Sequence, residues 1–427
     1  MMKQVVIIGN GISGVTAAIH IRQRSSCGIT IISDEHPVFF SRTALMYVFM
    51  GHMKLEHTQP YESWFWKEKN ITLIQDEVTA IRTEAHEITL RSGQTKSYDT
   101  LILATGSVPR RLDCAGEELD GVHVLYHVHD LKALEQRMRQ GVKRAVVAGG
   151  GLVGIELTEM LRSRRMEVDF LIRESWYWQS VLPEPEARML EAHITLHGVR
   201  LHFNKSIQAI HGDEWGRVQF AETEHAERHP CDLACVAIGV EPNVFVGLDS
   251  GIAIRRGFLV DEYLQTSAPD VYAIGDCAEL CNPQINRRAI EPVWYTGRLM
   301  GEAVAKVICG EQEKYNPGVW FNSAKFFDLE YQVYGVVNSD GSDSLYWQDR
   351  SNKRCLRLQL SADNTVVGIH AIGIRLRQEV CEGWIVSGAS AEEVIRTLGQ
   401  ACFDPEFTSN PFAAIIKEFE QTLLGSA

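Results

Sequence analysis

The chain has 427 residues, 45% of them hydrophobic and 23% charged, with a net charge of −13. This length predicts two or three domains, and the negative charge argues against binding nucleic acid or an anionic membrane over a broad surface. No apolar run approaches the roughly 20 residues that cross a bilayer, and an apolar run starts too close to Met1 for a signal peptide, so we expect a globular cytoplasmic protein without a transmembrane segment.

A glycine-rich turn follows the first apolar run, in VVIIGNGISG at residues 5–14. Gly9, Gly11 and Gly14 have the G-x-G-x-x-G spacing of a strand-to-helix turn that holds a pyrophosphate. The first glycine bends the chain, the second lets the backbone approach the phosphates, and the third lets the helix lie close to the strand. The helix N-terminus adds free N–H groups and its dipole. We expect the helix at 15–24 and a second strand at 29–33.

Two carboxylates, Asp34 and Glu35, follow that second strand. A carboxylate about 20 residues beyond the glycines accepts hydrogen bonds from the hydroxyls of a dinucleotide ribose. Asp34 is the better placed by count and Glu35 the second candidate; a solvated loop carboxylate is the alternative for this position. Residues 73–106 then read as several short strands.

The same pattern recurs in AVVAGGGLVGIE, residues 145–156, with Gly149, Gly151 and Gly154 in register. Glu174 follows the strand expected at 168–172, at the same offset from Gly154 as Asp34 has from Gly14. Such a carboxylate favours NADH, whereas the neighbouring Arg173 would accept the 2′-phosphate of NADPH, so NADH is preferred and NADPH stays open.

The repeat extends beyond the two turns. YDTLILATGSVPR, residues 98–110, matches CDLACVAIGVEPN, residues 231–243, and this alignment pairs Asp99 with Asp232, Ala104 with Ala237 and Gly106 with Gly239. Duplication of a βαβ unit with a β-meander explains the match. The sequence therefore predicts two bound dinucleotides.

The C-terminal part lacks the glycine motif and has a different pattern of apolar residues. VYAIGDCAE at 271–279 predicts a strand and a Gly-Asp turn, followed by two helices around 293–309. From Trp320, aromatic and β-branched runs predict an antiparallel sheet of about four strands, closed by helices at 378–387 and 391–398. A tail helix from Asn410 carries an apolar stripe, which we expect to dock on the protein itself rather than on a membrane.

Cysteine spacing offers no metal site. Cys231/Cys235 and Cys277/Cys281 have C-x-x-x-C spacing, but neither pair has a second pair or a set of histidines nearby to complete a zinc site. We therefore expect buried or incidental thiols and no metal.

These segments together resemble the FAD- and pyridine-nucleotide-dependent oxidoreductases with two dinucleotide-binding domains. The resemblance is carried by GNGISG, ATGSVPR, GGGLVGIE, AIGVEPN and AIGDCAE. It implies an α/β fold with two Rossmann-like FAD/NAD(P)-binding domains, each in three ββα layers, and a smaller α+β C-terminal domain. The implied boundaries are 1–118 with 245–318 for FAD, 119–244 for NAD(P)H, and 319–427 for a C-terminal domain of a type that often mediates homodimers.

The resemblance also implies individual roles. Residues expected at FAD are Gly9, Gly11, Gly14, Asp34, Glu35, Arg42, Val78, Thr105, Gly106, Arg110, Gly275 and Asp276. Gly149, Gly151, Gly154, Glu174 and Gly239 complete the cofactor-binding set, with NAD(P)H on the second turn. Glu156 matches a glutamate that lies near the nicotinamide in this family; a solvated helix carboxylate is the alternative.

Within the family, Phe40-x-Arg42-x-x-Leu45 resembles the Y-x-R-P-P-L segment of ferredoxin reductases and apoptosis-inducing-factor-like proteins. Tyr47 stands where those proteins usually have a lysine. Many members carry a redox-active cysteine in this region, but residues 37–53 contain none, so the usual disulfide reductase chemistry is not expected.

The implied function is hydride transfer from NAD(P)H to flavin N5, followed by electron transfer to an external acceptor. An electron-transfer protein of ferredoxin or rubredoxin type is the preferred acceptor. The alternatives are an NADH oxidase or quinone reductase and, from another class, an NADH-sensing interaction flavoprotein with incidental turnover. Because such carriers are usually acidic, docking would need a local basic patch, for which the doublets Arg110/Arg111, Arg164/Arg165, Arg255/Arg256 and Arg287/Arg288 are candidates.

Overall fold

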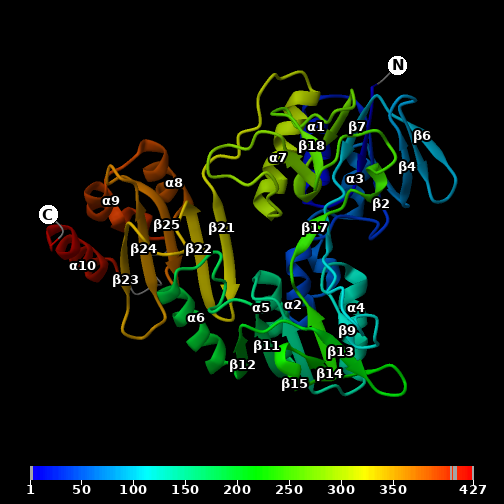
Figure 1. Cartoon of the computed structure of the whole chain (residues 1–427). Coiled ribbons are helices and arrows are strands. Elements are labelled where there is room, and N and C mark those ends of the chain that lie inside the picture. The colour runs from blue at the N-terminus through cyan, green and yellow to red at the C-terminus, as the bar shows by residue number, and fades with distance from the viewer. Residues whose placement is uncertain (1–2, 404–405, 407–410, 426–427) are drawn as a thin grey trace. The chain divides into compact units, whose positions relative to one another are not determined.

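The computed structural model describes residues 3–403, 406 and 411–425 (Figure 1). The chain divides into two compact units. The first comprises Met1–Arg110, Val124–Gln140 and Gly239–Pro317, and the second comprises Arg111–His123, Gly141–Ile238 and Gly318–Ala427. Within the described ranges, no helix reaches the length and apolarity needed to cross a bilayer.

A parallel sheet with the strand order β19-β7-β1-β2-β3 forms the centre of the first unit. Its strands are β1 (Gln4–Ile8), β2 (Gly28–Ser33), β3 (Ile71–Gln75), β7 (Thr100–Leu103) and β19 (Val271–Ala273). These strands are rich in Val, Ile and Leu because a parallel sheet is buried on both faces. An antiparallel meander of β4 (Val78–Arg82), β5 (Glu87–Leu90) and β6 (Thr95–Ser97) precedes β7 in the chain.

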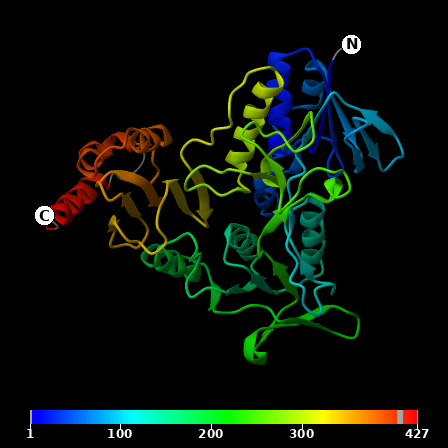
Figure 2. The same ribbon diagram turned by 45° about the horizontal axis from the view of Figure 1, so that its top comes forward.

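Two helices of this unit, α1 (Ile12–Arg24) and α7 (Trp294–Ile308), lie side by side, as Figure 2 also shows. A Cβ added at Gly301 would lie 2.6 Å from the backbone oxygen of Ser13, so glycine permits this close approach. The expectation of two helices around 293–309 was wrong. The glycines of α7 serve helix packing instead of ending the helix.

The described part of the first unit contains three further α-helices and two pairs of short strands. They are α2 (Leu45–Phe49), α3 (Ser63–Glu68), α4 (Val128–Arg139), the antiparallel pair β8 (Ser107–Pro109) and β17 (Val240–Pro242), and the parallel pair β18 (Phe258–Val260) and β20 (Ala278–Leu280). The two segments that the sequence repeat aligned, ATGSVPR and AIGVEPN, therefore meet along β8 and β17.

The second unit repeats the arrangement in a sheet ordered β12-β11-β10-β16-β9. Its strands are β9 (Val122–His123), β10 (Arg144–Ala148), β11 (Glu167–Ile172), β12 (Val199–Phe203) and β16 (Leu233–Val236), and its helices are α5 (Leu152–Ser163) and α6 (Glu184–Leu196). A meander of β13 (Ala209–Gly212), β14 (Val218–Glu222) and β15 (Arg228–Pro230) lies between β12 and β16 in the chain.

A corresponding aspartate links two strands within each of the two parallel sheets. Asp99, before β7, accepts a hydrogen bond from the backbone N–H of Gln4 at 2.6 Å. Asp232, before β16, accepts bonds from the N–H groups of Lys143 and Arg144 at 2.8 and 2.9 Å. Each aspartate thus ties the last strand of its repeat to the start of the first strand, as the match between the two sequence segments predicts.

The C-terminal sheet is antiparallel and also belongs to the second unit. Its strands, in spatial order, are β21 (Phe321–Phe326), β22 (Leu329–Gly335), β25 (Val366–Ile372), β24 (Cys355–Leu360) and β23 (Ser344–Gln348). We expected about four strands, because the run FFDLEYQVYG reads as continuous. A two-residue turn at Phe327 and Asp328 divides it, with Phe327 at a φ of +56°.

Helices α8 (Gln378–Ser387), α9 (Ala391–Thr397) and α10 (Phe412–Gly425) complete this part of the chain. Phe412, Ile415 and Phe419 are buried in the core that these helices share with the sheet. Docking of the tail helix on the protein itself is therefore confirmed; Asn410, where we expected it to begin, lies outside the described residues.

A buried ion pair joins α6 to the C-terminal sheet. The guanidinium of Arg357 on β24 donates to both carboxylate oxygens of Glu186 on α6, at 2.6 and 2.9 Å. Both side chains are almost fully buried, and His370 lies 3.4 Å from the same carboxylate. Removing one partner would leave a buried charge uncompensated, at a cost of about 3–5 kcal/mol.

Candidate dinucleotide-binding sites

The first glycine turn has one open position and two closed ones. Gly9 has a φ of +112°, and a Cβ added there would lie 2.1 Å from the carbonyl oxygen of Ala104. A Cβ at Gly14 would lie 2.1 Å from the carbonyl oxygen of Gly9. At Gly11, by contrast, an added Cβ has nothing within 4 Å. The backbone at Gly11 therefore faces open space at the N-terminus of α1, where a pyrophosphate can approach.

The second turn repeats this geometry almost atom for atom. Gly149 has a φ of +115°, and its added Cβ would lie 2.2 Å from the carbonyl oxygen of Ala237. The corresponding Cβ at Gly154 would lie 2.0 Å from the oxygen of Gly149, and at Gly151 nothing lies within 4 Å. In each turn, only the second glycine has open space beside its backbone. This geometry suits the binding of a dinucleotide pyrophosphate at both turns.

The two carboxylates beyond β2 have different surroundings. Asp34 is exposed. Glu35 accepts hydrogen bonds from Arg42 at 3.1 and 2.6 Å and from the backbone N–H of Val128 at 3.0 Å, with His127 at 3.4 Å. Burial alone would raise the pKa of Glu35, but these partners lower it to about 2. Glu35 is therefore an ionised carboxylate that fixes Arg42 and the start of α4.

Arg42 is held from several sides. Besides Glu35, its guanidinium donates to the carbonyl oxygen of Tyr126 and lies 4.5 Å from the centre of the Tyr126 ring. A cation fixed in this way is suited to bind an anionic group of a ligand.

The residues implied on the flavin side lie at the ends of the neighbouring strands β7 and β19. The hydroxyl of Ser107 donates to the carboxylate of Asp276. Burial raises the pKa of Asp276, and the bond from Ser107 opposes this shift. Gly275 has a φ of +73°, and an added Cβ would lie 2.3 Å from Oγ of Ser13. Any side chain at Gly275 would therefore disturb the end of β19 and the start of α1.

The other residues of this set are placed by backbone contacts. Thr105 donates its hydroxyl to the carbonyl oxygen of Asn243 at 2.5 Å. Gly106 has a φ of +71°. The N–H of Arg110 donates to the carbonyl oxygen of Gly239 at 3.0 Å. Val78 is buried at the start of β4.

Glu156 lies one turn into α5, close after the second glycine turn. Burial and the neighbouring Glu159 raise the pKa of Glu156 to about 7. Tyr177, which was not among the predicted site residues, has a buried hydroxyl with no hydrogen-bond partner among the described residues. Burial and the charge of Glu156 raise the pKa of Tyr177. No local sequence signal marks Tyr177, because it follows β11 and approaches α5 only in the folded chain.

Glu174 lies just beyond β11 and is half-buried. Its carboxylate is 3.1 Å from the guanidinium of the exposed Arg173. The acidic and basic candidates for the nucleotide's ribose thus contact each other, and both remain available at the end of the strand.

The cysteines form no disulfides among the described residues, and one arginine doublet is ion-paired within the chain. Each cysteine in the described part of the chain has a free thiol, and burial raises the pKa values of Cys231 and Cys235 to about 12. Arg255 and Arg256 both contact the buried carboxylate of Glu279, at 2.5 and 3.5 Å. The single carboxylate offsets one of the two positive charges of this doublet.

The two repeats with open glycine turns are consistent with a known family of proteins. A family model described as pyridine nucleotide-disulphide oxidoreductase matches residues 3–300. The chain belongs to this family. Membership confirms the resemblance found in the sequence, the oxidoreductase class, and FAD with NAD(P)H as the cofactors of that class.

Individual relatives share about 30% of their aligned residues with this chain. The chain is 31% identical over 341 residues to an NAD(P)H nitrite reductase of Bacillus subtilis, covering 79% of this chain and 41% of that protein. It is 30% identical over 339 residues to a ferredoxin–NAD(P)+ reductase of a Sphingomonas species, covering 78% and 81% of the two chains. The chain therefore spans less than half the length of the nitrite reductase that it resembles.

Among solved structures, a ferredoxin reductase from Rhodopseudomonas palustris matches with a TM-score of 0.81 at 24% identity, over 87% of this chain and 91% of that one. This likeness confirms the α/β fold with its C-terminal domain. The disulphide in the family's description has no counterpart in residues 37–53, which contain no cysteine.

Proposed function

We propose that the chain is an FAD-dependent NAD(P)H:acceptor oxidoreductase that passes electrons to a small protein of ferredoxin or rubredoxin type. The observation that carries this proposal is the pair of glycine turns, each open at its second glycine, in a chain without a cysteine at 37–53. The Sphingomonas relative, named a ferredoxin–NAD(P)+ reductase, supports the choice of acceptor.

The first unit would hold FAD. Gly9, Gly11 and Gly14 present the N-terminus of α1 to the pyrophosphate, and the acidic pair Asp34 and Glu35 stands at the ribose end. Arg42, Val78, Thr105, Gly106, Arg110, Gly275 and Asp276 complete this set. When bound, FAD would supply the capacity to take a hydride from NAD(P)H and to release the two electrons singly or as a pair.

The second unit would hold NAD(P)H. Gly149, Gly151 and Gly154 take its pyrophosphate, Glu174 its ribose, and Gly239 belongs to the linking segment. Glu156 would position the nicotinamide. Because its pKa is raised to about 7, the group changes charge near neutral pH and can accept or donate a hydrogen bond there.

Domain division, assembly and location also belong to this proposal. We propose an FAD domain of residues 1–118 and 245–318, an NAD(P)H domain of 119–244, and a C-terminal domain of 319–427 through which a homodimer forms. We propose that the protein works in the cytoplasm.

Anaerobic reduction followed by reoxidation tests the proposed function. NADH should bleach the flavin absorbance of the purified protein, and a ferredoxin or rubredoxin should restore it faster than oxygen, a quinone or ferricyanide. Fastest reoxidation by oxygen or a quinone would favour the oxidase or quinone reductase instead. Bleaching that no acceptor reverses at a useful rate would favour the NADH sensor, and a protein without flavin would overturn the assignment.

A substitution at Glu174 tests the choice of nucleotide. Glu174→Arg should shift the ratio of reduction rates from NADH towards NADPH, because it replaces a ribose acceptor by a phosphate-binding cation beside Arg173. The matched control is Glu167→Arg at the opposite end of β11, which adds the same charge and should leave the ratio unchanged. An unchanged ratio in Glu174→Arg would show that Glu174 does not contact the ribose.

A further inference from the structure

Three side chains of the second unit converge away from the glycine turn. His193 and His197 lie four residues apart at the C-terminal end of α6, and Asp328 lies in the turn between β21 and β22. Their ligand atoms all lie within 4.8 Å of one another. Oδ1 of Asp328 is 2.7 Å from Nε2 of His193 and 3.5 Å from Nε2 of His197.

The His197 ring is oriented as a metal ligand. Its Nδ1 lies 3.0 Å from the carbonyl oxygen of His193, which can only accept a hydrogen bond. Nδ1 therefore carries a proton, and Nε2 points towards Asp328. Metal-binding histidines commonly donate their second nitrogen to a carbonyl in this way. The ring also stacks on Phe327, at 4.1 Å between centroids and an interplanar angle of 17°, which fixes its direction.

His193 contributes a buried ring nitrogen that faces Asp328. The side chain is 5% exposed, and its Nε2 lies 2.7 Å from Oδ1 of Asp328. Burial lowers the pKa of His193; Asp328 opposes this shift, and His197 and Lys353 add to it.

We propose that His193, His197 and Asp328 bind one divalent transition-metal ion, with Zn²⁺ preferred. Two imidazole nitrogens one helical turn apart and a carboxylate oxygen form a donor set suited to Zn²⁺, and a water would complete the tetrahedron. Ligand atoms around one tetrahedral zinc lie about 3.4 Å apart, so the contact between His193 and Asp328 would open by roughly 0.7 Å. Asp328 is 67% exposed, which leaves an entry path and room for that adjustment.

The ion would have a structural role. It would fasten the C-terminal end of α6 to the β21–β22 turn, on the same helix whose first turn is tied to β24 by Glu186 and Arg357. The C-terminal sheet would then be fixed to α6 at both ends of the helix. This role is independent of the proposed redox function.

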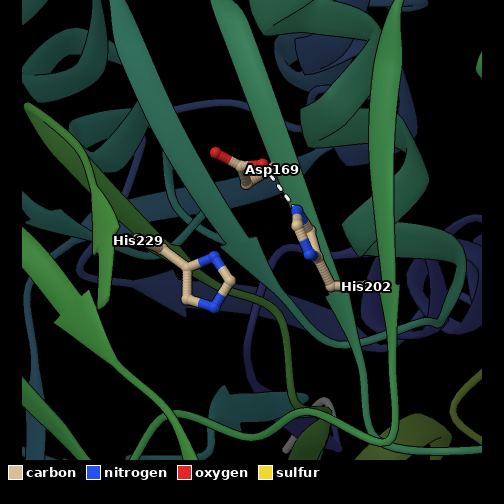
Figure 3. Close-up of side chains that lie close together, drawn as sticks. All are labelled: Asp169, His202 and His229. Atoms are coloured by element: carbon tan, nitrogen blue, oxygen red, sulfur yellow. Dashed lines mark hydrogen bonds and ion pairs between the residues drawn. The ribbon is translucent and has the colours of Figure 1, made fainter. Parts of the chain in front are cut away.

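A second histidine and aspartate cluster provides the contrast. Asp169, His202 and His229 also lie close together on β11, β12 and β15 (Figure 3). Both oxygens of Asp169, however, accept hydrogen bonds from the guanidinium of Arg200, at 2.8 and 2.9 Å. Burial alone would raise the pKa of Asp169, but Arg200 and His202 lower it well below its usual range. The guanidinium occupies the carboxylate and its charge repels a cation, so we assign this cluster to an ion-pair network.

Zinc titration of the full-length, flavin-containing protein tests the proposal. The protein would carry no affinity tag, would be stripped of metal with EDTA, and would have the exposed Cys281 changed to Ser so that its thiol binds no zinc. Calorimetry should show one Zn²⁺ per chain, and the midpoint of thermal unfolding should rise as Zn²⁺ is added. Co²⁺ at the same site should give tetrahedral absorption at wavelengths beyond the flavin band.

The decisive variants change the two more accessible ligands. His197→Ala and Asp328→Ala should each weaken zinc binding by at least about tenfold and abolish the cobalt spectrum, while reduction by NADH stays unchanged. His202→Gln, in the second cluster, should bind zinc as the unmodified chain does. The proposal is overturned if the unmodified chain binds no zinc, if both variants bind with full affinity, or if the affinity is lost in His202→Gln instead.

Discussion

At the scale of single residues, Glu156 and Glu35 are two carboxylates whose pKa values the fold shifts in opposite directions. Glu156 lies on α5 just after the glycine turn, and burial together with Glu159 raises its pKa to about 7. Glu35 shows the opposite balance, because His127, Arg42 and the N–H of Val128 overcome the effect of burial and lower its pKa to about 2. The fold thus keeps one carboxylate ionised beside the first turn and holds another near its point of titration beside the second.

This contrast predicts a pH-dependent effect of Glu156→Gln on stability. A carboxyl whose pKa is raised in the folded state destabilises the fold as pH rises above its unfolded pKa, and this cost stops growing above the folded pKa of about 7. The free energy of unfolding of Glu156→Gln, relative to the unmodified chain, should therefore increase between about pH 5 and about pH 8. Chemical denaturation across this range measures it.

The control for that measurement is Glu214→Gln, because Glu214 is exposed. Its stability difference from the unmodified chain should stay constant over the same range. A constant difference for Glu156→Gln as well would mean that the folded protein does not raise the pKa of this carboxyl.

At the scale of elements, the sequence is most informative where a rule is local. The glycine spacing predicted both turns, and β1, β2, β10, β11 and α8 lie where apolar periodicity placed them, because each depends on neighbouring residues. The helix after the first turn begins at Ile12 rather than Val15, since Gly11 already serves as its N-cap. The single helix α7 was missed because Gly297 and Gly301 normally weaken a helix, and only the approach of α1 explains them.

Features that join distant segments could not be predicted from local pattern. The contact of Glu35 with Val128, the ion pair of Glu186 with Arg357 and the cluster around His193 each link residues far apart in the chain. No metal was expected, because neither cysteine pair has the further ligands of a zinc site nearby in the sequence. The spacing of His193 and His197 is visible in the sequence, but their third partner, Asp328, is brought to them by the C-terminal sheet.

At the scale of the whole molecule, the main feature is an internal repeat. One strand–turn–helix unit occurs twice, and in both copies an added Cβ would clash at the first and third glycines but not at the second. In each copy a corresponding aspartate, Asp99 or Asp232, ties the last strand to the first. The repeats differ in the carboxylate that follows them: the pKa of Glu35, after the first repeat's second strand, is lowered, whereas the pKa of Glu156, on the helix of the second, is raised. Two cofactors of one chemical class can therefore be bound by one fold and given different electrostatic surroundings.

The most direct test of this claim compares Gly11→Leu with Gly151→Leu. At both positions an added Cβ meets nothing within 4 Å, and the φ angles of −71° and −93° suit any residue, so both variants should fold. Gly11→Leu should be purified without flavin. Gly151→Leu should retain its flavin, remain reducible by dithionite and lose reduction by NADH. Full flavin content in Gly11→Leu, or unimpaired reduction of Gly151→Leu by NADH, would contradict the assignment of the two turns.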